Sequence, residues 1–80
     1  MALFSIVITE GNARQDEMAG EYPDASDAID EAKRFLFDVG RDILTRDDMG
    51  SVRIQVRTAA GGLVFDANLE YAVHAEGAAG

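Results

Sequence analysis

The stretch PDASDAIDEAKRFLFDVGRDILTR, residues 23–46, decides the fold of this 80-residue chain. Its apolar side chains recur at spacings of three and four, which places them within roughly a third of the circle of an α-helix. Pro23 interrupts any preceding element, and the Asp24 carboxylate can accept hydrogen bonds from the free N–H groups of a first helical turn. We therefore predict an amphipathic helix over residues 25–46, with Gly50 as its terminator. The predicted apolar stripe comprises Ala25, Ala28, Ile29, Ala32, Leu36, Val39 and Ile43.

The apolar surface of this helix is wider than one packing face needs. Phe35 lies at one border of the stripe, whereas Phe37 and Leu44 lie beyond the other border. Such a surplus can mark a partner surface, so we predict that Phe35 and Phe37 contact a partner. Gly40 lies on the apolar side and costs about 1 kcal/mol relative to Ala in a helix interior. We expect a close approach to a sheet at that position.

Two stretches flanking the helix alternate between apolar and polar residues, which is typical of strands with one buried face. Residues 2–9, ALFSIVIT, and residues 51–58, SVRIQVRT, each show this alternation. A glycine-containing turn over residues 59–62 leads into a return strand over residues 63–67. Residues 68–73 either extend that strand or break off from it.

The polar segment between the first strand and the helix is harder to assign. Residues 10–20, EGNARQDEMAG, contain glycine breaks and favour a turn, with a short second strand around residues 17–22 as an option. The resulting order is strand, optional short strand, helix, strand, strand. An α+β domain in two layers buries these elements most simply: an antiparallel sheet of three to four strands with one long helix across one face. We predict a single domain over residues 1–73 and a flexible tail over residues 74–80.

The charge and composition narrow the classes of function. The net charge is −8, and it lies almost entirely in the first 50 residues. An acidic domain repels phosphate backbones and anionic lipids, so we expect neither nucleic-acid binding nor membrane binding, whereas a basic protein partner is compatible. The chain has no cysteine, which fits a reducing compartment, and its apolar N-terminal run is too short to span a bilayer. We expect a cytoplasmic protein.

The acidic stretch EYPDASDAIDEA, residues 21–32, can be interpreted as a metal site or as the polar side of a helix start. Its carboxylates lack the alternate spacing and the central glycine of a calcium-binding loop. On a helix, Asp27, Asp30 and Glu31 fall on the polar side, near the positive end of the helix dipole. We expect ion pairs along that side: Arg34 with Asp30 or Asp38, Arg41 with Asp38, and Arg46 with Asp42.

No constellation of catalytic residues is visible in the sequence. His74 is the only histidine, and no serine lies in a nucleophile-elbow motif. The sequence contains no glycine-rich phosphate-binding motif. Gly61 and Gly62 belong to a predicted hairpin turn and not to a turn between a strand and a helix. We therefore predict that the protein is not an enzyme and needs no metal or cofactor.

One polar stripe stands out in the predicted strand of residues 51–58. Arg53, Gln55 and Arg57 project from the same face, opposite to the apolar residues. This stripe could bind a carboxylate or a phosphate. It could equally form the solvent face of a half-covered sheet, with an arginine paired across strands to Asp66.

The chain resembles a small bacterial domain family of unknown function that is common in proteobacteria related to the rhizobia. An acidic turn, a Pro-Asp helix start and an alternating closing strand carry the resemblance. The residues are Asp16-Glu17, Gly20-Glu21, Pro23-Asp24, Ala28, Glu31-Ala32, Val52-Arg53-Ile54-Gln55-Val56 and Leu63-Val64-Phe65. The opening LFSIVITEG departs from the aromatic-His opening of typical members. The resemblance implies a bacterial, cytoplasmic, single-domain α+β protein, and it supplies no activity, cofactor or catalytic residue. A looser resemblance links the strands and the Pro-Asp turn to antitoxin domains with a partial double-stranded-RNA-binding fold.

These observations together predict a non-enzymatic protein-interaction or regulatory module. The alternative is an antitoxin-like module that binds a nucleic acid or an anionic ligand through Arg53 and Arg57. Exposed edge strands and the wide apolar helix face make a homodimer or another protein partner the expected assembly.

Overall fold

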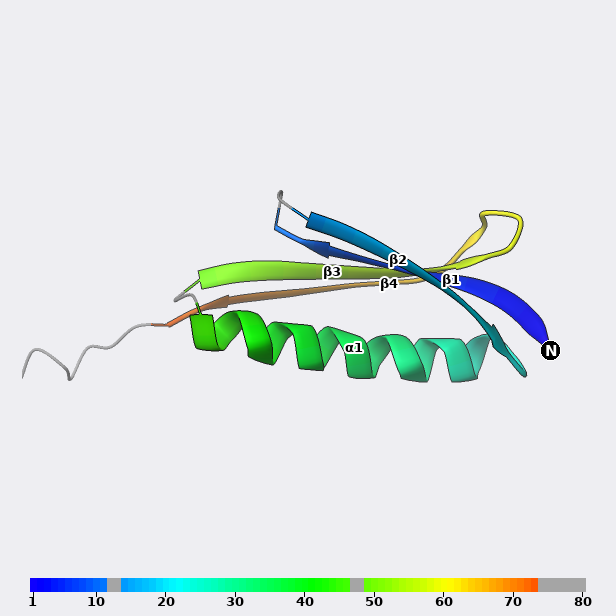
Figure 1. Cartoon of the computed structure of the whole chain (residues 1–80), viewed down its shortest axis with the longest axis horizontal. Coiled ribbons are helices and arrows are strands. Elements are labelled where there is room, and N and C mark those ends of the chain that lie inside the picture. The colour runs from blue at the N-terminus through cyan, green and yellow to red at the C-terminus, as the bar shows by residue number, and fades with distance from the viewer. Residues whose placement is uncertain (12–13, 47–48, 74–80) are drawn as a thin grey trace, which may run out of the picture.

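The computed structural model describes residues 1–11, 14–46 and 49–73. It has two layers, in which one long helix runs along one face of a sheet (Figure 1). The predicted α+β class and the order β-β-α-β-β are confirmed. The predicted tail, including His74, lies outside the described residues. The elements are β1 (Ala2–Glu10), β2 (Arg14–Tyr22), α1 (Ala25–Arg46), β3 (Met49–Thr58) and β4 (Leu63–Ala72).

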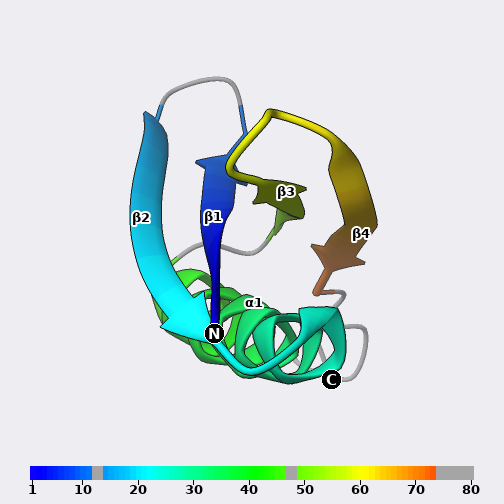
Figure 2. The same ribbon diagram turned by 90° about the vertical axis from the view of Figure 1, so that its right-hand side faces the viewer.

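The sheet has the strand order β2-β1-β3-β4, and every neighbouring pair is antiparallel. β1 and β3 are therefore the central strands, while β2 and β4 form the two edges on opposite sides of the molecule (Figure 2). Residues directly opposite each other share a face, so the pair Ile8↔Ile54 fixes which side chains meet α1.

The core lies between α1 and the two central strands. Val52, Ile54 and Val56 of β3 are completely buried, and Ala28 and Ala32 of α1 are equally inaccessible. Each large aliphatic side chain removed from water contributes roughly 1.5–3 kcal/mol, which makes this seam the main stabilising contact of the fold. The small alanines let the first turns of α1 lie close to the sheet. The rest of the core cluster is Phe4, Ile6, Ile8, Leu36 and Ile43.

The start of α1 matches the prediction. The Asp27 backbone N–H donates a hydrogen bond to Asp24 Oδ1 at 3.0 Å, so Asp24 is the N-cap. The predicted terminator was wrong: α1 ends at Arg46, and Gly50 lies inside β3. A Cβ atom at Gly50 would stand 2.7 Å from the hydroxyl oxygen of Tyr71, so the glycine makes room for that ring.

The second strand is much longer than the short segment predicted around residues 17–22. β2 begins at Arg14 and pairs with β1 over its whole length, from Glu10↔Arg14 to Ala2↔Tyr22. The polar composition of this segment hid the strand, because main-chain pairing with β1 overrides a weak strand propensity. β4 likewise continues through Ala72, which settles the open alternative for residues 68–72 in favour of extension.

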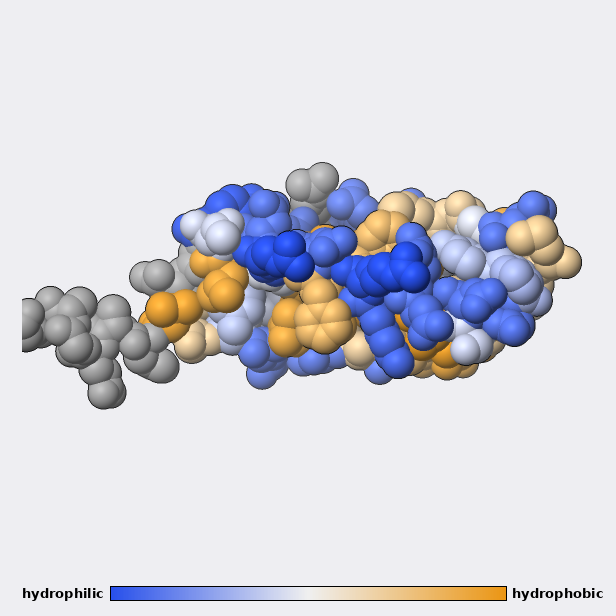
Figure 3. All heavy atoms as spheres, turned by 90° about the horizontal axis from the view of Figure 1, so that it is seen from below, coloured by the Kyte–Doolittle hydropathy of each residue, from blue (hydrophilic) through white to orange (hydrophobic). Residues whose placement is uncertain are grey.

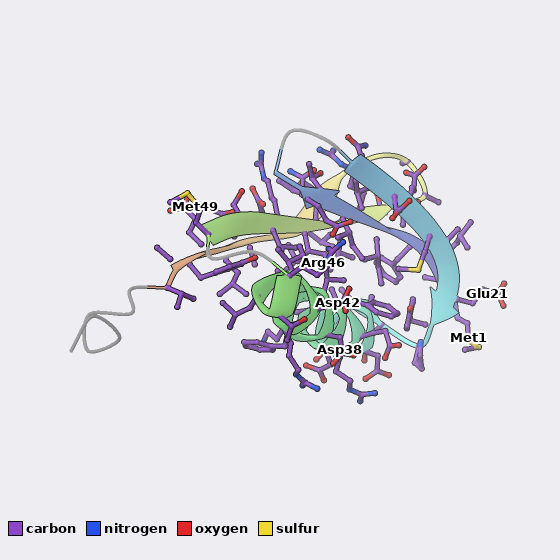
Figure 4. The ribbon with its side chains drawn as sticks, turned by 60° about the vertical axis from the view of Figure 1, so that its left-hand side comes forward. Met1, Glu21, Asp38, Asp42, Arg46 and Met49 are labelled. Atoms are coloured by element: carbon purple, nitrogen blue, oxygen red, sulfur yellow. The ribbon has the colours of Figure 1, made fainter. Side chains whose placement is uncertain are left out.

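Ion pairs on α1 differ in detail from the predicted series. Arg34 pairs with Glu31 at 3.3 Å and Arg41 with Asp38 at 3.7 Å, whereas Arg46 pairs with Glu10 of β1 at 3.5 Å. In Figure 4, Arg46 lies at the end of the helix on the side facing the sheet, and Asp38 lies on the opposite side of the helix. The Arg41–Asp38 pair was predicted. Arg34 and Arg46 instead pair with carboxylates other than the ones that we predicted for them.

Candidate interaction surface

A groove with a volume of about 400 Å³ runs between the second half of α1 and the end of β4. We call it the α1–β4 groove, and its lining residues are Phe37, Gly40, Arg41, Leu44, Leu69 and Tyr71. The lining is mostly apolar, and much of it remains in contact with water. Phe37 is 61% exposed and Leu44 is 44% exposed. Apolar residues emerge between the charged side chains when the molecule is viewed from the helix side (Figure 3).

The groove exists because α1 covers the sheet unevenly. It packs most heavily on β3, whose helix-facing valines and isoleucine are completely buried. The helix-facing residues of β4 are only partly buried. The inner face of this edge strand therefore remains half-covered, and the residues concerned are Phe65, Ala67, Leu69 and Tyr71.

Gly40 sets the floor of the groove. A Cβ atom at this position would lie 2.6 Å from Leu69 Cδ2, which is closer than any real contact. The predicted close approach of helix and sheet at Gly40 is confirmed, and the sheet residue involved belongs to β4.

The two phenylalanines that we predicted as partner contacts have different environments. Phe35 is partly buried and packs against the core, whereas Phe37 projects into the mouth of the groove. They lie on opposite flanks of α1, as their helical spacing requires. Phe37 is therefore the phenylalanine available to a partner, and Phe35 mainly stabilises the fold.

The stripe of Arg53, Gln55 and Arg57 lies on the sheet face turned away from α1, whereas the groove lies on the face that packs against α1. Arg53 makes a bidentate pair with Asp66, with Nε to Oδ1 at 3.0 Å and Nη2 to Oδ2 at 2.8 Å. The hydrogen bond from Arg53 lowers the pKa of the Asp66 carboxyl and, reciprocally, raises the pKa of the guanidinium. The cross-strand pairing with Asp66 that we weighed is thus present.

Arg57 is engaged within its own hairpin. Its Nη1 donates a hydrogen bond to the Gly61 carbonyl oxygen at 3.0 Å, and its Nη2 donates to Gln55 Oε1 at 3.4 Å. An anion arriving at this face would have to compete with those acceptors and with Asp66. Binding of an anion there stays a prediction with less geometric support than the groove.

The acidic stretch over residues 21–32 contributes the N-cap and one ion pair of α1, as described above. Within residues 1–11, 14–46 and 49–73, no group of three or more His, Cys, Asp or Glu side chains is arranged to hold a metal ion. No helix in these ranges is long and apolar enough to cross a membrane.

Sequence reasoning found one wall of the groove and missed the other. The surplus apolar border of the helix pointed to Phe37 and Leu44. Leu69 and Tyr71 were missed because residues 68–73 had two open assignments. The alternation Phe65, Ala67, Leu69, Tyr71 carried the signal, since strict period-two spacing indicates a continuous strand.

The fold and surface together define a small α+β domain with one open apolar edge. The chain belongs to the family described as Domain of unknown function (DUF6894), whose model matches residues 3–70. The match includes parts of all five elements, and it leaves out the first residue of β1 and the last residues of β4. Comparison with curated proteins and with solved structures gave no match.

Proposed function

We propose that this protein is a non-enzymatic protein-interaction module that binds its partner through the α1–β4 groove. The observation that carries the proposal is the exposure of Phe37, 61%, at the mouth of a groove whose other wall is the half-covered edge strand β4. An aromatic anchor next to open main-chain hydrogen-bonding groups offers both affinity and register to a partner.

The energetic case rests on the apolar area left in water. Complete burial of a Phe or Leu side chain contributes roughly 1.5–3 kcal/mol. At Phe37 and Leu44, about half of that contribution is still to be gained by burial against a partner. A partner that covers both residues and the inner face of β4 would gain several kcal/mol before the cost of association is subtracted. The helix elsewhere shows charged side chains to solvent, which concentrates this gain at the groove.

The anionic-ligand alternative at Arg53, Gln55 and Arg57 has weaker support. One of its two cations, Arg53, is already paired with Asp66, and the overall charge of −8 repels phosphate backbones. As part of the same proposal, the absence of cysteine favours a reducing, cytoplasmic setting for the interaction.

Site-specific photo-crosslinking in living cells that express the chain tests the proposal. A benzophenone amino acid at Phe37 should give one or a few discrete adducts of higher mass after illumination. The same probe at Asp42, which is exposed on the helix, is the matched control and should give none. The adduct can contain a second copy of the chain or another protein, so the test does not depend on the partner's identity.

The opposite results are equally clear. If position 37 yields no adduct, or if positions 37 and 42 yield the same smear, the groove is not a specific interaction surface. Disappearance of the adduct when Leu44→Glu is added would show that the whole groove, and not a single ring, is engaged.

A further inference from the structure

We infer that the occupant of the α1–β4 groove is a second copy of this chain, which pairs antiparallel with β4 about a two-fold axis at Leu69. The inference rests on the proposed function and names its partner. This pairing of the two β4 strands would join two four-stranded sheets into one continuous sheet, with both helices on the same side.

The two edges of the sheet differ in a way that singles out β4. β2 carries four charged residues among nine, and the register with Ile8 places one of them, Asp16, on the helix-side face. Charges on an edge, and inward-pointing ones above all, discourage pairing with another strand. β4 is ten residues long and contains neither Lys, Arg nor Pro. Its charges are only two, and one of them, Asp66, is paired with Arg53.

Avoidance of like charges narrows the choice of register. Antiparallel pairing that keeps both helices on one side requires a two-fold axis through a residue, because only then do residues of the same face meet. An axis through Asn68 would place Asp66 opposite Glu70 twice, which is unfavourable. An axis through Leu69 instead places each Asn68 amide opposite the Glu70 carboxylate of the second copy. Asn68 Nδ2 already donates to its own Glu70 Oε1 at 3.3 Å, so amide and carboxylate lie on the same face.

An axis through Ala67 also avoids opposed charges, but it separates the two grooves along the strand. Leu69 is the residue that contacts Gly40, and it lines the groove. An axis through Tyr71, which also lines the groove, would pair only residues 70–72 of β4, whereas the axis at Leu69 pairs residues 66–72. The axis at Leu69 therefore brings the two grooves together over the longer stretch of strand, so that each one helps to cover the other.

The helices then complete the contact. With the axis level with Gly40, Phe37 of one helix lies level with Leu44 of the antiparallel helix. Two helices centred over β3 of each copy would stand three strand spacings apart, about 14 Å. Close-packed helices stand about 8–10 Å apart, so side chains must fill a gap of several ångströms. Phe37 and Leu44 are the large apolar side chains available there. Arg41 of the two copies would also approach, and Asp38 at 3.7 Å within each copy reduces their repulsion.

Mass measurement of the purified full chain is the first part of the test. Sedimentation or light scattering from about 1 μM to about 1 mM should show a shift from the chain mass of 8.6 kDa to twice that mass. Phe37→Glu should weaken the association at least tenfold while the circular dichroism spectrum is retained. Leu3→Glu is the matched control, because Leu3 is similarly exposed, 48%, but lies on the other face of the sheet, and it should leave association unchanged.

Cysteine pairing fixes the register, since the chain has no cysteine of its own. An oxidised equimolar mixture of Asn68→Cys and Glu70→Cys chains should give the disulfide heterodimer. A mixture of Asp66→Cys and Asn68→Cys, which reports the axis at Ala67, should not. A monomer throughout the concentration range would overturn the inference, as would a dimer that resists Phe37→Glu and shows no Asn68–Glu70 link. If the purified chain is monomeric while Phe37 still crosslinks another protein in cells, only the identity of the partner is wrong and the proposed function stands.

Discussion

Gly40 is a residue at which the helix backbone lies close to the sheet. A glycine in a helix interior is unfavourable by itself, and here it is retained at the point where Leu69 of β4 approaches the helix backbone. The same contact ties the groove to the edge strand. The identity of this single residue therefore links the packing of the domain to its proposed interaction surface.

We predict that Gly40→Ala changes the stability of the chain by less than about 1 kcal/mol. The gain of about 1 kcal/mol in helix propensity is offset by the displacement of the Leu69 side chain, whose Cδ2 would lie 2.6 Å from the new Cβ atom. Urea unfolding followed by circular dichroism measures the change. In a Leu69→Ala background the same substitution should stabilise the chain by the full propensity gain, and the same change in both backgrounds would refute the contact as the cause.

Asp66 makes the stability of the folded protein depend on pH in the acidic range. Its pKa lies below the ordinary value of 3.8, chiefly because of the hydrogen bond from Arg53. A carboxyl whose pKa is depressed by folding stabilises the folded state above its unfolded pKa, and this contribution is lost as the pH falls through the folded pKa.

We therefore predict that Asp66→Asn lowers the free energy of unfolding at pH 7, and that this difference shrinks once the pH falls below about 4. The carboxyl resonance of Asp66 in an NMR titration should have its midpoint below 3.8. Arg53→Gln should return that midpoint toward 3.8, and a midpoint that ignores Arg53 would contradict the pairing.

At the scale of elements, α1 is the element whose limits the sequence signals best. Its amphipathic period gave the range 25–46, which the structure reproduces. Asp24 begins the helix by accepting the N–H of Asp27 at 3.0 Å. Loss of this bond leaves one of the first N–H groups without its side-chain acceptor.

We predict that Asp24→Ala costs about 1 kcal/mol of stability, the usual effect of removing an N-cap. Thermal unfolding should show a lower Tm. The control is Asp30→Ala, an exposed carboxylate nearly two turns further along the helix, which should change stability by less than about 0.5 kcal/mol. Equal effects at the two positions would mean that Asp24 contributes only its charge.

Some strands were predicted more accurately than others, and the difference depends on the place of each strand in the sheet. β1 and β3 are central and half-buried, so their alternation is written into the sequence through Phe4, Ile6, Val52 and Ile54. β2 is a polar edge strand held largely by its ladder with β1, and local composition carries little trace of that pairing. Gly50 was misassigned as a helix end because the structural reason for a glycine there, the ring of Tyr71, is distant in sequence.

At the scale of the whole molecule, the helix is too narrow for the sheet. A single helix covers β1 and β3, and the inner face of β4 is left half-covered beside Phe37 and Leu44. Two copies joined at β4 would share this uncovered strip, which makes the edge strand the centre of a larger two-layer body. The charged edge at β2 would remain at the outside of that assembly.

Hydrogen–deuterium exchange at the two edges tests this account most directly. The outward amides of an unpaired edge strand exchange rapidly, whereas pairing with another strand protects them. We predict that amides of β4 around Leu69 become protected as the concentration of the purified chain rises from micromolar to millimolar, while those of β2 do not change. Protection at β2 instead, or exchange at β4 that is independent of concentration, would contradict the assignment of the α1–β4 edge as the surface at which two copies meet.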